Sequence, residues 1–96
     1  MYMKKYDAEM KIMVAVCDTE IIGKIFREGD LVLKLEEGFY KGDEASEKEV
    51  KEALSGATIA NIAGEKSVAC AVDCGCIDPE NVIFIKGVPH AQMVRL

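Results

Sequence analysis

The sequence predicts an α+β fold: a single small domain, residues 1–96, in which a mixed β-sheet is combined with about three helices. Three observations lead to this prediction. Two segments near the N-terminus have strand character, a serine–glutamate capping box opens an amphipathic helix, and a strand, a helix and another strand follow one another in the C-terminal half. A chain of this length buries about two-thirds of its unfolded surface, enough for one hydrophobic core.

The N-terminal segments predict a β-hairpin. Residues 2–6 and 11–17 flank a short polar connection at residues 7–9. The second segment is apolar almost throughout, which is typical of a strand that is buried on both faces.

A short helix, a turn and a half-buried strand are expected next. Asp18 can cap a helix that runs to Ile22 and ends at Gly23. After a turn at residues 27–30, three leucines recur at every second position, which predicts a strand. They are Leu31, Leu33 and Leu35.

The capping box of Ser46 and Glu49 opens a helix over residues 47–55, which Gly56 ends. Residues 57–62 are harder to assign, since their isoleucines and threonine favour a strand and their alanines favour a helix. We interpret this segment as a short buried strand, because glycines lie on both sides of it.

The helix predicted over residues 65–74 is the clearest in the chain, and Gly75 ends it. Strands at residues 82–86 and 92–96 follow. Between them, Gly87-Val88-Pro89-His90 has the residue types of a fixed turn. The apolar face of the helix is expected to consist of Val68, Ala69, Ala71 and Val72.

The order strand, helix, strand predicts a C-terminal βαβ-like unit with parallel strands. Residues 61–64 and 87–90 then emerge at the same edge of the sheet, where ligands of open α/β sheets bind. Free amides at the start of the helix also favour an anion there. The candidate ligand-binding residues are therefore Asn61, Gly64, Lys66, Ser67 and Gln92.

His90 is the only histidine and the candidate catalytic residue, because an imidazole titrates near neutrality and can transfer protons. No motif pairs it with a nucleophile. The alternative is a turn histidine that is hydrogen-bonded to the backbone.

The clustered cysteines do not predict a metal site. Their spacing, Cys-x3-Cys-x-Cys, matches no common zinc motif, so we expect neither a metal nor another cofactor. Cys70 and Cys74 make their helix weakly apolar nearly all round, and a second subunit could cover that side. Phe39 and Tyr40, in a predicted loop, are further interface candidates; the alternative is that they close the core.

The net charge of −5 argues against non-specific binding of nucleic acid, although it does not exclude a local basic patch. The first ten residues carry four charged side chains and lack the apolar region of a signal peptide. The longest uncharged run, residues 53–64, is shorter than the ~18 residues of a membrane helix. We therefore expect a soluble cytoplasmic protein that has no membrane contact.

Several runs of the sequence resemble a family of small archaeal proteins of unknown function. The resemblance covers nearly the whole chain, and it implies a cytoplasmic archaeal protein without carrying over any activity, cofactor or catalytic residue. The clustered cysteines are not part of the pattern. The runs are Cys17-Asp18, Gly23-Lys24, residues 26–29, 57–61 and 77–83, and, as the most distinctive, Gly87-Val88-Pro89-His90-Ala91-Gln92.

We expect a non-enzymatic binding or self-associating interaction module, most simply a homo-oligomer, that uses the edge near His90 or the cysteine-bearing helix. One alternative is a small enzyme in which His90 moves a proton while the helix start after Gly64 holds an anionic ligand. Another is an RNA- or translation-associated accessory protein. This last alternative would be favoured if one face of the molecule grouped Lys4, Lys11, Lys24 and Arg27.

Overall fold

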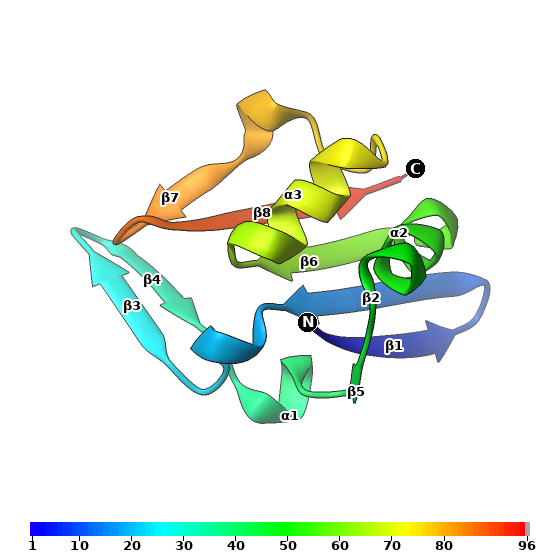
Figure 1. The fold of residues 1–96 in the computed structure, drawn as a ribbon, viewed down its shortest axis with the longest axis horizontal. Coiled ribbons are helices and arrows are strands. Elements are labelled where there is room, and N and C mark those ends of the chain that lie inside the picture. Colours follow the sequence, from blue (N-terminus) through cyan, green and yellow to red (C-terminus); the bar gives the residue numbers. More distant parts are fainter. Residues whose placement is uncertain (96) are drawn as a thin grey trace.

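A computed structural model describes residues 1–95, which form a mixed six-stranded β-sheet with two helices on one face and a small β-hairpin and a short helix on the other (Figure 1). The strand order is β5-β1-β2-β6-β8-β7. The predicted α+β class, with a mixed sheet and about three helices, is confirmed. The strands of the large sheet are Tyr2–Ala8 (β1), Lys11–Cys17 (β2), Asp43–Glu44 (β5), Ile59–Ala63 (β6), Ile83–Ile85 (β7) and Val88–Val94 (β8).

The predicted N-terminal hairpin is confirmed. β1 and β2 pair antiparallel, and the two-residue turn between them holds Glu9 and Met10 at positive φ angles of 41° and 68°. A turn of this kind matches the right-handed twist of the two strands. Neither residue is the glycine or asparagine that usually marks such a turn, so the sequence signal for it is weak although the pairing is regular.

The segment that was hardest to assign is a strand, as predicted. β6 pairs parallel with β2 and antiparallel with β8. Its side chains alternate between the two faces of the sheet. Ala60 and Ile62 are fully buried on the helix side, and Asn61 belongs to the opposite face.

The predicted βαβ-like unit is present with one strand inserted into it. Helix α3 (Glu65–Asp73) lies between β6 and β7 in the chain. Both strands are antiparallel to β8, so they are parallel to each other, and β8 lies between them.

The turn predicted at residues 87–90 is wrong in detail. The turn residues are Lys86 and Gly87, at φ angles of 52° and 78°, and β8 already begins at Val88. His90 therefore lies inside a strand. Most of the predicted final strand is confirmed within β8, and Leu96 lies outside the described residues.

Helices α2 (Glu47–Gly56) and α3 cover one face of the sheet. The capping box of α2 is confirmed: the Glu49 N–H donates to the Ser46 hydroxyl at 3.2 Å, and the Ser46 N–H donates to the Glu49 carboxylate at 3.0 Å. Val50 and Leu54 anchor α2 in the core, since both are fully buried.

The predicted apolar face of α3 is only partly correct. Val68 and Ala71 are buried, but Ala69 is exposed. Ser67 and Cys70 are buried as well. Because α3 packs against α2 as well as the sheet, its buried arc is wider than one stripe and is turned toward α2.

The other face of the sheet is partly covered by strands β3 (Ile25–Glu28) and β4 (Leu31–Lys34), which pair as a separate hairpin, and by helix α1 (Glu37–Tyr40). β3 was not predicted, because its four residues show no regular apolar alternation. Two short 3-10 helices, Thr19–Ile21 and Pro79–Asn81, complete the fold.

The residues buried between the large sheet, the β3–β4 hairpin and α1 form a cluster that we call the second core. It contains Ala15, Cys17, Leu33, Leu35, Tyr40, Ala63 and Ile85. No helix among residues 1–95 is long and apolar enough to cross a membrane.

Candidate functional site

The two segments that were expected to meet at one place in the sheet do meet there. In the pairing of β6 with β8, Ala63 lies opposite His90 and Asn61 lies opposite Gln92. Paired residues point to the same face of a sheet. Asn61, His90 and Gln92 therefore share the face opposite α2 and α3.

The imidazole of His90 has a fixed orientation. Its Nδ1 lies 2.9 Å from the carbonyl oxygen of Ile62. Because a carbonyl only accepts hydrogen bonds, Nδ1 carries the proton of the neutral ring and Nε2 presents a lone pair. Burial lowers the pKa of His90, and the bond to Ile62 partly offsets this effect. At neutral pH, His90 is therefore an uncharged acceptor.

The two amide side chains beside His90 bind each other. The Gln92 Nε2 donates to the Asn61 Oδ1 at 2.8 Å, and the Asn61 Nδ2 lies 3.9 Å from the sulfur of Met13. The polar atoms at the centre of this surface are thus largely satisfied within the chain. The described contacts leave the Gln92 Oε1 and the His90 Nε2 free to bind something else.

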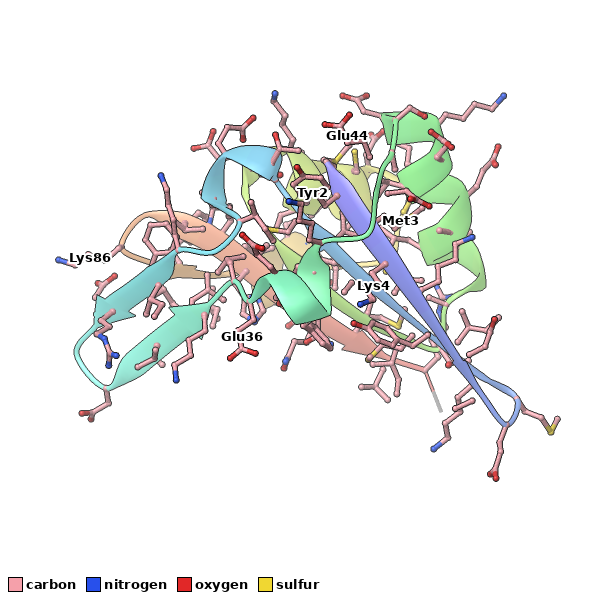
Figure 2. The ribbon with its side chains drawn as sticks, turned by 90° about the horizontal axis from the view of Figure 1, so that it is seen from below. Tyr2, Met3, Lys4, Glu36, Glu44 and Lys86 are labelled. Atoms are coloured by element: carbon pink, nitrogen blue, oxygen red, sulfur yellow. The ribbon has the colours of Figure 1, made fainter. Side chains whose placement is uncertain are left out.

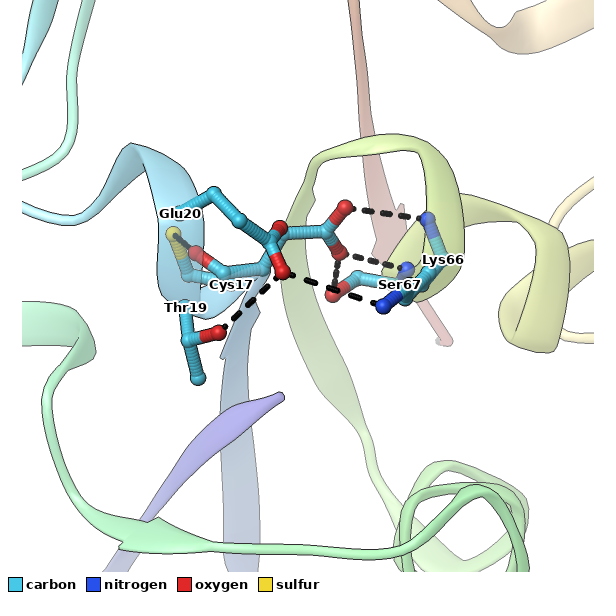
Figure 3. A network of polar contacts seen from close by, with 6 residues as sticks. Cys17, Thr19, Glu20, Lys66 and Ser67 are labelled. Carbon is cyan, nitrogen blue, oxygen red and sulfur yellow. Dashed lines mark hydrogen bonds and ion pairs between the residues drawn. The ribbon is translucent and has the colours of Figure 1, made fainter.

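The start of α3, predicted to bind an anion, is occupied by a carboxylate of the chain itself (Figure 3). Asp18 accepts hydrogen bonds from the Lys66 N–H at 3.0 Å, the Ser67 N–H at 2.8 Å and the Ser67 hydroxyl at 2.7 Å. Asp18 and Ser67 are both buried. The prediction that Asp18 caps the short helix following it is wrong, because that helix has no side-chain cap.

Gly64 makes this arrangement possible. Its φ of 106° is strained for any residue with a side chain, and a Cβ at this position would overlap the Asp18 carboxylate. An external anion at the amides of Lys66 and Ser67 would have to displace Asp18. Lys66 itself is exposed and forms only a long ion pair with Glu20, at 3.7 Å.

Part of the sheet face that carries His90 lies outside the second core. We call this part the open face; in it, Ile83 and Val94 are 47% and 63% exposed. The strand registers place no aspartate or glutamate on this side of β1, β2, β6, β7 or β8, although the chain contains 17 acidic residues. The open face consists of Met13, Ile59, Asn61, Ile83, His90, Gln92 and Val94.

Two shallow hollows adjoin the open face. One, of about 220 Å³, is lined by Asn81, Ile83, His90 and Gln92. The other, of about 270 Å³, lies beside Ile59 and Val94. Protruding apolar side chains and shallow depressions therefore occur on the same surface.

The interface residues expected on other elements are mostly occupied within the fold. Phe39 and Tyr40 lie in helix α1 rather than in the predicted loop. Tyr40 is buried, and Phe39 stacks on Tyr6 with ring centroids 5.6 Å apart, so this helix closes the second core. Cys70 is buried, and the half-buried Cys74 directs its thiol to the Ala71 carbonyl. Within residues 1–95, no three His, Cys, Asp or Glu side chains are grouped as a metal site.

Four basic residues of the N-terminal third bear on the RNA-associated alternative. Lys4 in β1 donates to the Gly38 carbonyl at 2.8 Å, and Lys11 lies at the beginning of β2. Lys24 and Arg27 belong to the β3 region. Lys4 and Lys11 lie on the side of the sheet that carries the second core, and the RNA-associated alternative, which needs all four residues on one face, stays a prediction.

Comparison with known proteins supports the family expectation. The model of a family described as "Protein of unknown function (DUF424)" matches residues 6–96. Among solved structures, an uncharacterised conserved protein from the archaeon Methanopyrus kandleri superposes with a TM-score of 0.78 at 22% identity, covering 99% of this chain and 93% of that chain. No curated protein matches the chain.

The structural likeness at this identity shows a shared fold and nothing of function. The importance of the Gly-Val-Pro-His-Ala-Gln run stays a prediction, and so does a cytoplasmic location. The match over residues 6–96 covers nearly the whole chain, and the protein therefore belongs to the DUF424 family of unknown function.

Proposed function

We propose that this protein is a non-enzymatic interaction module that associates with a second copy of itself through the open face. The observation that carries the proposal is the lack of carboxylates on this side of β1, β2, β6, β7 and β8, in a chain with 17 acidic residues and a net charge of −5. Interface centres are depleted of charged residues. Two copies that meet here keep their acidic groups away from the contact.

The polar groups of the open face support burial by a partner. Burying an amide costs free energy unless it is hydrogen-bonded. Asn61 and Gln92 already bind each other, and the pKa of His90 is lowered, so the imidazole is uncharged. A partner therefore needs to satisfy few further groups.

The shape of the surface favours a two-fold arrangement. In such a contact the same patch meets itself, so a protrusion of each copy can enter a depression of the other. Val94 and Ile83 are the exposed apolar side chains of the open face, and a hollow adjoins each of them. The proposed contact includes His90 and Asn61, which the sequence analysis named as candidate site residues.

The experiment is sedimentation velocity of the wild type and of V94E over 1–200 µM. We expect a dimer for the wild type and a dissociation constant raised at least about a hundredfold for V94E, since each copy would bury a carboxylate in a largely apolar contact. I25E is the matched control, because Ile25 is 53% exposed in a strand outside the open face. A monomeric wild type, or equal weakening by I25E, would refute the proposal.

One observation favours a second function, a small enzyme in which His90 transfers a proton. The Nε2 of the fixed imidazole is free beside the hollow of about 220 Å³. A free lone pair on a neutral ring is what a general base requires. A small substrate in this hollow would place its acidic proton near Nε2.

This second function predicts that a mixture of small carboxylic acids and phosphate esters shifts the His90 ring signals in NMR spectra at pH 7. The same mixture should leave the backbone signals of H90Q near Gln92 unchanged. Ring signals that do not respond would remove this candidate.

A further inference from the structure

The outer face of the β3–β4 hairpin has a charge pattern unlike the rest of the chain. Ile25 pairs with Lys34 and Arg27 pairs with Val32, so two aliphatic and two cationic side chains alternate over four neighbouring positions. All four are exposed, with Ile25 at 53% and Val32 at 44%. The other side of the hairpin faces the second core through Phe26 and Leu33.

The two cations of this face form no ion pair with a side chain among residues 1–95. The side-chain ion pairs among residues 1–95 are Lys51 with Asp73 and Lys66 with Glu20. The acidic Glu28 of the same hairpin lies on its inner side, opposite Leu31, and accepts a hydrogen bond from the Lys86 N–H at 2.6 Å. Figure 2 shows the hairpin extending to one side of the large sheet, near Lys86.

We propose that this outer face is a docking surface for an extended acidic segment of another protein, in which an apolar and an acidic side chain stand two positions apart. Residues i and i+2 of an extended chain lie on one side, about 6.5–7 Å apart. Ile25 and Arg27 have that same spacing within β3. A segment running along β3 can therefore place an aliphatic side chain on Ile25 and a carboxylate on Arg27.

The distance over which electrostatic interactions act favours a short acidic segment over a larger polyanion as the partner of this face. At physiological ionic strength the Debye length is about 8 Å, so a short segment experiences mainly the local charges of the hairpin. A nucleic acid or an anionic membrane extends further and meets the rest of a surface whose net charge is −5. The outer face also contains no aromatic side chain on which bases could stack.

The test is fluorescence anisotropy with a labelled eight-residue peptide in which isoleucine and glutamate alternate, separated by serines. R27A and K34A should each weaken binding about two- to fivefold, as expected for exposed ion pairs. K48A, which removes an exposed cation from α2, is the matched control and should leave the affinity unchanged. A peptide with lysines in place of the glutamates should not bind.

Two further titrations test whether a membrane or a nucleic acid binds this face instead. Vesicles of phosphatidylcholine and phosphatidylserine, and a uridine oligonucleotide, are titrated under the same conditions. Binding of either of these in preference to the peptide would overturn the proposal, as would equal losses in K48A and R27A. V94E, which is directed at the open face, should bind the peptide like the wild type, so the self-association of the open face is tested separately.

Discussion

Replacement of Asp18 by alanine is expected to lower the free energy of unfolding by about 3–4 kcal/mol. The carboxylate accepts three hydrogen bonds at the start of α3, from two backbone amides and the Ser67 hydroxyl. Loss of an N-terminal cap costs about 1–2 kcal/mol. The buried Ser67 hydroxyl loses its partner as well, which costs about 1–3 kcal/mol.

Urea unfolding followed by circular dichroism measures this change. For a domain of this size, the expected loss corresponds to a melting temperature lower by about 12–25 °C. The S67A substitution should cost about 1–2 kcal/mol in the wild type and much less in D18A, since the hydroxyl then has no partner to lose. A loss below about 1 kcal/mol for D18A, or full additivity of the two substitutions, would refute this account of the cap.

Three other outcomes are expected. G64A should lose about 3 kcal/mol or more in urea unfolding, because its φ of 106° disfavours a Cβ and that Cβ would meet Asp18, whereas G29A, with open space around it, should lose less. Since burial lowers the pKa of His90 below 6.5, the unfolded chain binds more protons, so stability should be full above pH 6.5 and fall as the pH drops below that value. That slope should disappear in H90Q; an unchanged slope would assign it to other groups. S46A should lose about 1 kcal/mol in thermal unfolding through the capping box of α2, and a neutral effect would show that the box contributes nothing.

The structure also explains why the helix start after Gly64 looks like a phosphate-binding loop without being a complete one. A glycine followed by free amides at a helix start suits any anion. Here the anion is the side chain of Asp18, which comes directly after a buried strand. Ser67, one helical turn before the apolar Cys70 and Ala71, was the sequence signal that could have pointed to an internal partner.

The open face could have been recognised from the sequence of β8 if residues 88–90 had been interpreted as part of a strand rather than as a turn. Ala91 and Met93 are buried, while His90, Gln92 and Val94 alternate with them. This period of two includes Pro89, which we interpreted as part of a turn because Gly87 and Pro89 are residue types of a fixed turn. Pro89 is tolerated because no N–H is needed at this position: the carbonyl of Gly64, which lies opposite Pro89, accepts instead from the Val68 N–H at 2.9 Å.

The sequence by itself determined the elements that depend on near neighbours in the chain: the N-terminal hairpin, the capped helix α2, the strand β6 and the helix α3. Their signals are apolar periodicity, capping and glycines, all of which act over a few residues. Only the tertiary structure decided that β8 lies between β6 and β7, that Asp18 caps a helix 48 residues away in the chain, and that one half of a sheet face remains uncovered. These features depend on which distant segments pack together, and packing is selected by the burial of the whole core rather than by any local pattern.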